Sequence, residues 1–163
     1  MGSVKPPNHL TTVMCIFKAM DHSVPKITGG TQYGIVNAQS YMQCNRVNGD
    51  QPYDFKVMLS TNTAISNCLE SGNFYLVIGK LITTTNGNPP VITYNQNSAT
   101  LVQSPEGAQL DMINKVGLVG LGHMISSAEV IAEGTEDAVC LEVIVAHNDW
   151  DPRVGFHVVV VIQ

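Results

Sequence analysis

The residues of this chain best suited to chemistry are aromatic and basic side chains on strand-like segments and in the loops beside them. Tyrosine rings at half-exposed strand positions suit the stacking of nucleobases, and nearby lysine or arginine side chains suit contact with phosphate. The candidate binding residues are Arg46, Lys56, Tyr75, Lys80, Tyr94 and Trp150. The same tyrosines also fit an ordinary half-buried structural role, so the sequence leaves both interpretations open.

A glycine-rich segment at residues 117–124, GLVGLGHM, resembles the start of the hydroxyacid dehydrogenases that act on 3-hydroxyisobutyrate-type substrates. The dinucleotide pattern needs a third glycine for close helix packing, and Ile125 stands at that position. A dinucleotide site also needs a strand before the glycines and a helix after them, whereas strand-like sequence follows here. We interpret the segment as a curved strand and expect no cofactor.

Other catalytic patterns are missing or weak in this sequence. It contains no Gly-x-Ser-x-Gly elbow, no phosphate-binding Walker loop and no readable pair of catalytic carboxylates. His147, Asp149 and Asp151 could offer metal ligands, but the two aspartates before Pro152 are more typical of a turn, and we expect no metal. The chain is therefore predicted not to be an enzyme. A hydrolase with a dispersed site remains an alternative, because triad members meet only in the fold.

Length and composition predict one domain over residues 1–163 with a real core. Hydrophobic residues make up 44% and charged residues 13%, which excludes a disordered chain. The net charge is −5, with an excess of two positive charges in residues 1–80 and of seven negative charges in residues 81–163. A protein that is negative overall has no general attraction to nucleic acid, so binding would need a local basic groove.

The hydropathy and the cysteine spacing of the chain bear on its cellular compartment. No apolar run reaches the length of a membrane-spanning helix, and the first residues lack the apolar segment of a signal peptide. The four cysteines show no CxxC spacing, which favours free thiols over a zinc site or disulfides. We expect an intracellular protein, nuclear or cytoplasmic, without a membrane partner.

Frequent valine, isoleucine and threonine, with turn residues at short intervals, predict many short strands. The expected strands cover residues 11–18, 31–43, 54–60, 73–85, 91–94, 99–103, 118–131, 138–147 and 154–162. Gly79, in the middle of one strand, predicts a bulge or a sharp bend. Tyr75 and Lys80 should lie on opposite faces unless that bulge shifts the register. Ser104, Pro105 and Glu106 predict the start of a short helix over residues 105–115.

This order of elements predicts an all-β, mainly antiparallel fold with one short helix. A strand bent at a glycine, a helix after the third strand and two closing strands match a five-stranded Greek-key barrel, and a β-sandwich is the alternative. We assign residues 73–163 to the barrel and residues 1–72 to an N-terminal β extension. The architecture resembles OB-fold proteins. The segments 79–82 and 147–152 are similar to small OB-like proteins of fungal genomes.

The resemblance implies binding of single-stranded nucleic acid, DNA or RNA, along the sheet face and its loops. This chain departs from that pattern because it is acidic and contains little arginine. The alternative is a structural or protein-interaction β-sandwich that assembles with itself or with another protein. The apolar strand at residues 158–162 fits that alternative, because such an edge needs a cover.

Overall fold

The computed structural model describes residues 10–25, 33–45, 52–83, 87–102, 110–131, 139–147 and 157–162. The elements are β1 (Thr12–Lys18), β2 (Val24–Pro25), β3 (Tyr33–Asn45), β4 (Pro52–Ala64), the single 3₁₀ turn η1 (Ile65–Asn67), β5 (Phe74–Ile82), β6 (Val91–Val102), β7 (Val116–Val119), β8 (His123–Ile131), β9 (Val139–His147) and β10 (His157–Ile162). The predicted all-β class is confirmed.

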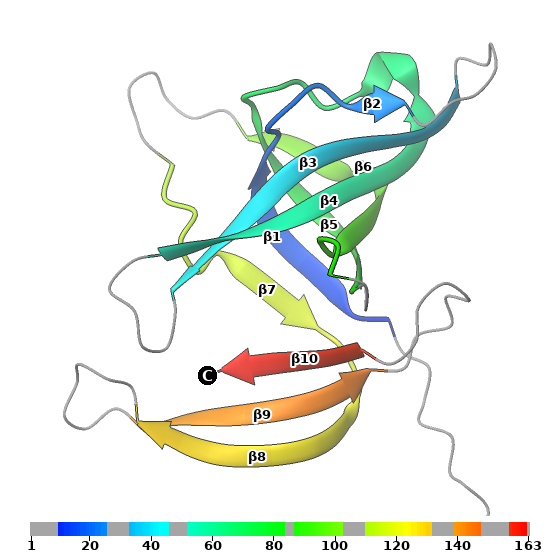
Figure 1. Cartoon of the computed structure of the whole chain (residues 1–163). Helices are drawn as coiled ribbons and strands as arrows, with labels where there is room; N and C mark the ends of the chain where they lie inside the picture. Colours follow the sequence, from blue (N-terminus) through cyan, green and yellow to red (C-terminus); the bar gives the residue numbers. More distant parts are fainter. Residues whose placement is uncertain are drawn as a thin grey trace, which may run out of the picture.

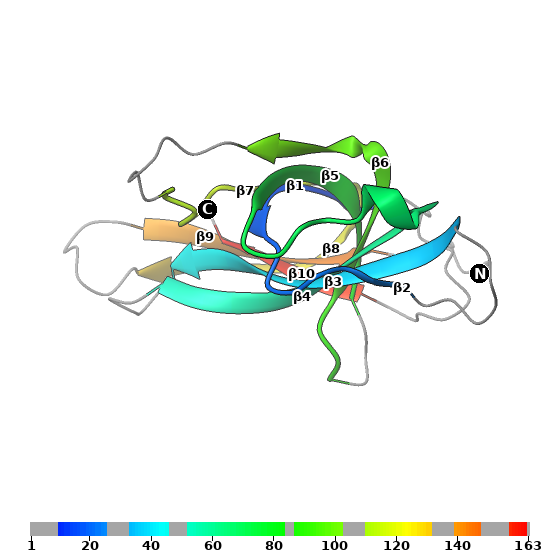
Figure 2. The ribbon, with the colours of Figure 1, turned by 90° about the horizontal axis from the view of Figure 1, so that it is seen from above.

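The first seven strands form one curled sheet in the order β2-β3-β4-β6-β5-β1-β7 (Figures 1 and 2). Within it β3 pairs antiparallel with β4, β4 parallel with β6, β6 antiparallel with β5, and β5 antiparallel with β1. The chain just after β1 returns to β3, since the backbone N–H of Met20 donates to the carbonyl of Gln39 at 3.0 Å. This is the Greek-key order of a five-stranded OB-type barrel, and it confirms that prediction.

The barrel occupies a different part of the chain from the one expected. Its strands β1, β3, β4, β5 and β6 all lie between Thr12 and Val102. The division into an extension over 1–72 and a barrel over 73–163 does not describe this sheet, because three of the five barrel strands precede residue 73. Strand-like composition alone does not show which strands will pair.

The predicted helix is not present in the described part of its range, residues 110–115. Ile113 forms a β-bridge with Gln43, and the N–H of Asn114 donates to the Gln43 carbonyl at 2.9 Å. Asn114 has a φ of 56°, a left-handed conformation that does not continue a helix. Pairing with β3 therefore replaces helical hydrogen bonds here, while residues 105–109 lie outside the described residues.

The barrel interior is filled by alternate residues of its strands, as the period of two requires. The largest fully buried side chains include Val13, Phe17, Leu59, Val77 and Ile92. Gly79 lies where β5 closely approaches residues 92 and 93 of β6. A Cβ there would lie 2.8 Å from both Ile92 Cγ2 and the Thr93 carbonyl oxygen, so only glycine fits without movement.

A second sheet contains three strands in the order β10-β9-β8, drawn below the barrel strands in Figure 1. The strand expected over 118–131 is divided between β7 and β8 at residues 120–122. The last two strands, β9 and β10, pair antiparallel, and β10 is an edge strand of this sheet. Within the described residues, no helix is long and apolar enough to cross a membrane.

Candidate functional site

The outer surface of β3 and β4 carries mostly polar side chains. Val36, Ala38, Ser40 and Met42 of β3 are buried, and Val57, Leu59, Thr61 and Thr63 of β4 are buried. The residues between them therefore point outward. We call their outward set the β3–β4 face: Ile35, Asn37, Gln39, Tyr41, Gln43, Asp54, Lys56, Met58, Ser60 and Asn62.

At one end of the β3–β4 face, Tyr41 and Lys56 are directly opposite each other across the two strands. Lys56 is exposed and Tyr41 is half-buried. Partial burial raises the pKa of Tyr41, and the nearby Asp54 carboxylate raises it further. Gln43 Nε2 donates to Asp54 Oδ1 at 3.0 Å, which holds that carboxylate at the edge of the pair. An aromatic ring and an ammonium group thus stand side by side on an open surface.

Amide groups continue the β3–β4 face toward the start of β3. Gln39 is exposed, and its backbone N–H donates to Asp21 Oδ1 at 3.1 Å. That bond ties the segment between β1 and β3 to the edge of the face. A second exposed ring stands at the far end, where the Tyr33 hydroxyl donates to the Asn62 carbonyl at 3.4 Å. The face can therefore stack rings, donate and accept hydrogen bonds, and hold one negative group.

The six sequence-predicted residues do not form one surface. Lys56 lies on the β3–β4 face, and Lys80 lies on the outer side of β5, opposite Thr12 of β1. Tyr75 and Tyr94 both line a pocket within the barrel end, on the other side of the sheet from Lys80. Two of the six, Arg46 and Trp150, lie outside the described residues.

The alternation along β5 explains why Tyr75 and Lys80 are separated. The register shift falls between Val77 and Gly79, as the glycine predicted. Its extra residues belong to β6, where residues 95–98 are inserted between the partners of Val77 and Gly79. Because β5 itself keeps its period of two, Tyr75 faces the core and Lys80 faces outward.

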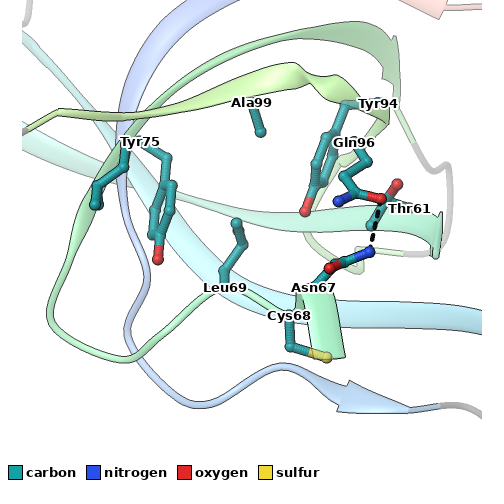
Figure 3. A pocket seen from close by; sticks show the side chains of 9 residues that line it. Thr61, Asn67, Cys68, Leu69, Tyr75, Tyr94, Gln96 and Ala99 are labelled. Carbon is teal, nitrogen blue, oxygen red and sulfur yellow. Dashed lines mark hydrogen bonds between the residues drawn. The ribbon is translucent and has the colours of Figure 1, made fainter. Parts of the chain in front are cut away.

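The pocket that contains Tyr75 and Tyr94 has a volume of about 240 Å³ and opens beside η1 (Figure 3). The Tyr75 hydroxyl accepts a hydrogen bond from the Glu70 N–H at 2.9 Å. Burial raises the pKa of Tyr94 to about 12, with smaller contributions from Cys68 and Tyr75. These tyrosines are therefore pocket residues rather than part of an open stacking surface.

Sequence reasoning missed Tyr41, Tyr33 and the amide side chains of β3. Their signal was present, because apolar or small residues alternate with them between Val36 and Met42. That alternation shows which side chains point outward. It does not show that β3 and β4 are the neighbours that combine their outer surfaces.

The described residues do not form a cluster of side chains suited to bind a metal ion. No group of three or more histidine, cysteine, aspartate or glutamate side chains in those ranges could hold a metal ion. The expected turn at Asp149 and Asp151 lies outside the described residues.

Comparison with known proteins supports the fold and adds no sequence relative. No protein-family model matches the chain, and no curated protein matches it. Among solved structures, a mutant of the single-stranded DNA binding protein from Thermus aquaticus is similar, with a TM-score of 0.54 and 11% sequence identity. The match covers 96% of this chain and 77% of that one. The chain thus shares the OB-type fold with a single-stranded DNA binding protein.

Proposed function

We propose that this protein binds single-stranded nucleic acid along the β3–β4 face and does so without catalysis. OB-type barrels bind oligonucleotides on the face of their second and third strands, which are β3 and β4 here. The observation that carries the proposal is the outward-facing pair of half-buried Tyr41 and exposed Lys56 on that face. The similarity to a single-stranded DNA binding protein supports it at the level of the fold.

Each component of the β3–β4 face has a role in this proposal. A base stacks on the Tyr41 ring while Lys56 contacts a neighbouring phosphate. The amides of Gln39 and Asn62 offer donors and acceptors to exposed base edges. Duplex DNA keeps its bases stacked and paired inside the helix, so it cannot offer its ring faces to Tyr41. The face therefore selects single strands.

The direct test is fluorescence anisotropy of a labelled oligothymidylate and of a duplex of equal length, at low and moderate salt. We expect the single strand to bind more tightly and its affinity to fall as salt rises. Equal affinity for the duplex, or no binding at tens of micromolar protein, would contradict the proposal.

Two variants locate the binding surface. Tyr41→Ala should weaken binding about tenfold, because loss of one stacked base costs about 1–3 kcal/mol. Lys56→Ala should also weaken binding, whereas Lys80→Ala is the matched control. Lys80 lies on the outer side of β5, which stands between β6 and β1 in the sheet and pairs with neither β3 nor β4. A loss of affinity in Lys80→Ala equal to that in Lys56→Ala would point to unspecific charge attraction.

A second candidate function is contact with another protein through the outer side of β1 and β5. Met14 and Ile78 are 49% and 44% exposed there, and Ile16 and Leu76 continue the same apolar strip. A groove of about 380 Å³ runs from this strip to β7. Such a patch is typical of interaction surfaces. A mass in solution that rises with concentration, and that Met14→Lys returns to the monomer value, would support this function.

A further inference from the structure

The connection after β4 contributes Asn67, Cys68 and Leu69 to the pocket at the barrel end. The 3₁₀ turn Ile65–Asn67 begins this connection. Of residues 95–98, inserted in β6, Gln96 lines the pocket, next to Asn67. Asn95 Oδ1 accepts the Asn97 N–H at 3.2 Å, which shapes this insertion and brings Gln96 to the pocket.

The side chain of Gln96 is held so that its nitrogen is available to a ligand. Its Oε1 accepts hydrogen bonds from Thr63 Oγ1 at 2.7 Å and from Asn67 Nδ2 at 3.1 Å. Because both bonds use the oxygen, the amide orientation is fixed. Figure 3 shows the amide nitrogen directed toward the Tyr94 side of the pocket. The pocket thus has a positioned hydrogen-bond donor.

The hydroxyl of Thr61 is an independent sign that the pocket takes a polar ligand. Thr61 lines the pocket and is only 4% exposed. Within the described residues, its Oγ1 has no hydrogen-bond partner. A buried hydroxyl without a partner is unfavourable, and a ligand that offers a donor or acceptor would satisfy it.

The remaining walls define the chemical class of that ligand. Tyr75 and Tyr94 supply aromatic surface, and Leu69, Ala99 and Leu101 supply apolar surface. Among the described residues that line the pocket, none has a charged side chain. It therefore favours a neutral, flat ring with hydrogen-bonding groups at its edge over a phosphate or a sugar alone.

We propose that this pocket binds one unpaired nucleobase, with a ring carbonyl accepting from Gln96 Nε2 and a polar edge meeting Thr61 Oγ1. A cavity of about 150 Å³ suffices for benzene, so about 240 Å³ has room for a single heteroaromatic ring. That the base belongs to a bound strand rests on the function proposed above. A free nucleoside is the other source of the same chemistry.

The test uses the Cys68 thiol, which lines the pocket, as a reporter. The full-length protein is treated with iodoacetamide at mildly alkaline pH, because burial raises the pKa of Cys68. The labelling reaction contains thymidine, deoxyribose or oligothymidylate. Peptide mass spectrometry then measures how fast each cysteine is labelled. We expect thymidine and the oligonucleotide to slow Cys68 labelling severalfold and deoxyribose to leave it unchanged. Thymidine should not affect Cys44, at the far end of β3.

Two variants separate the pocket from its surroundings. Gln96→Glu keeps the acceptor for Thr63 and Asn67 but replaces the donor with a carboxylate oxygen, so thymidine protection should be lost. Asn95→Asp is the matched control, with the same charge change one residue away and outside the pocket lining. Thr61→Val should weaken protection about threefold to tenfold, as expected for one neutral hydrogen bond, and should leave the fold intact.

The outcomes distinguish the two proposals. If the oligonucleotide binds but neither it nor thymidine protects Cys68, the pocket inference is overturned and the β3–β4 face stands. If thymidine protects Cys68 while no oligonucleotide binds, the base in the pocket does not come from a bound strand. That result would also overturn the proposed function. Protection that is equal in wild type and Gln96→Glu would also overturn the assigned contacts.

Discussion

At the scale of single residues, Lys56 is the basic side chain among the residues that we assign to the β3–β4 face. Its contact with phosphate therefore determines how binding through this face depends on salt. Each phosphate contact to a single strand contributes a slope of about −0.7 to the plot of log affinity against log salt. We expect Lys56→Ala to make that slope shallower by about 0.7. Titrations at four or more salt concentrations measure it. An unchanged slope would mean that Lys56 contacts no phosphate.

Tyr94 provides a second residue-scale prediction, which concerns stability at high pH. Burial raises its pKa from 10.0 to about 12, so folding favours the protonated phenol. Its contribution to the free energy of unfolding is complete below pH 10 and is lost as the pH rises through about 12. Burial raises the pKa of Cys15 to about 12 as well, so part of the loss persists without Tyr94.

We therefore expect the free energy of unfolding to fall between pH 10 and pH 12 in wild type, and to fall less in Tyr94→Phe. Urea unfolding followed by circular dichroism at several pH values measures this. Tyr33→Phe, at an exposed ring, is the control. If Tyr33→Phe flattened the curve as much as Tyr94→Phe, burial of Tyr94 would not be the cause.

Residue types allowed part of the site to be predicted. Lys56 was identified because it lies in an alternating strand segment, and it does face outward. The sequence fits surface positions for Tyr75 and Tyr94 as well as buried ones, because it does not show which face of β5 and β6 forms the barrel interior. Tyr41 and its partner Lys56 are 15 positions apart along the chain, so their pairing has no local signal. Such a pair exists only after β3 and β4 have formed their register.

At the scale of elements, the contact of β5 with β6 depends on Gly79. An added methyl group would meet the Thr93 carbonyl, a backbone atom that cannot rotate away. Gly79→Ala should therefore lower the free energy of unfolding by about 1–3 kcal/mol, as overpacking does. Gly117→Ala is the control, since a Cβ there meets only ordinary contacts at 3.7 Å. Urea unfolding compares the two, and equal effects would contradict the close approach at Gly79.

Local sequence signals predicted the interruption of β6 correctly but predicted a helix after β6 that residues 110–115 do not form. The gap between the expected strands at 91–94 and 99–103 coincides with the inserted residues 95–98 of β6. The helix signal at Ser104–Glu106 was also local, but Asn114 bonds to the backbone of β3 instead. A cap sequence raises the probability of a helix without fixing it, because tertiary pairing supplies competing hydrogen bonds.

At the scale of the whole molecule, the type of fold was more predictable than the residue range of the barrel. Branched residues and frequent turns determine an all-β chain, and the OB-type barrel follows the expected order of strands. The barrel begins at Thr12 because the earlier strands β1, β3 and β4 close it. Pairing between strands that are far apart along the chain has no local sequence signal.

The distribution of charge gives a prediction for the whole chain. Residues 123–163 contain seven acidic groups and one basic group, so their removal changes the net charge from −5 to +1. The barrel strands and the β3–β4 face precede this segment. A chain ending at residue 122 should keep its circular dichroism spectrum of strands and bind single strands more tightly at low salt. Loss of binding by a folded truncated chain would place the interface in the second sheet.

The central claim is that a single strand lies across the outer surface of β3 and β4. The most direct measurement is photo-crosslinking of an oligonucleotide that carries 5-iodouracil, followed by peptide mass spectrometry. We expect crosslinks at Tyr41 or Tyr33 that excess unlabelled single strand suppresses and duplex does not. Crosslinks confined to β8–β10, or to the outer side of β1 and β5, would contradict it.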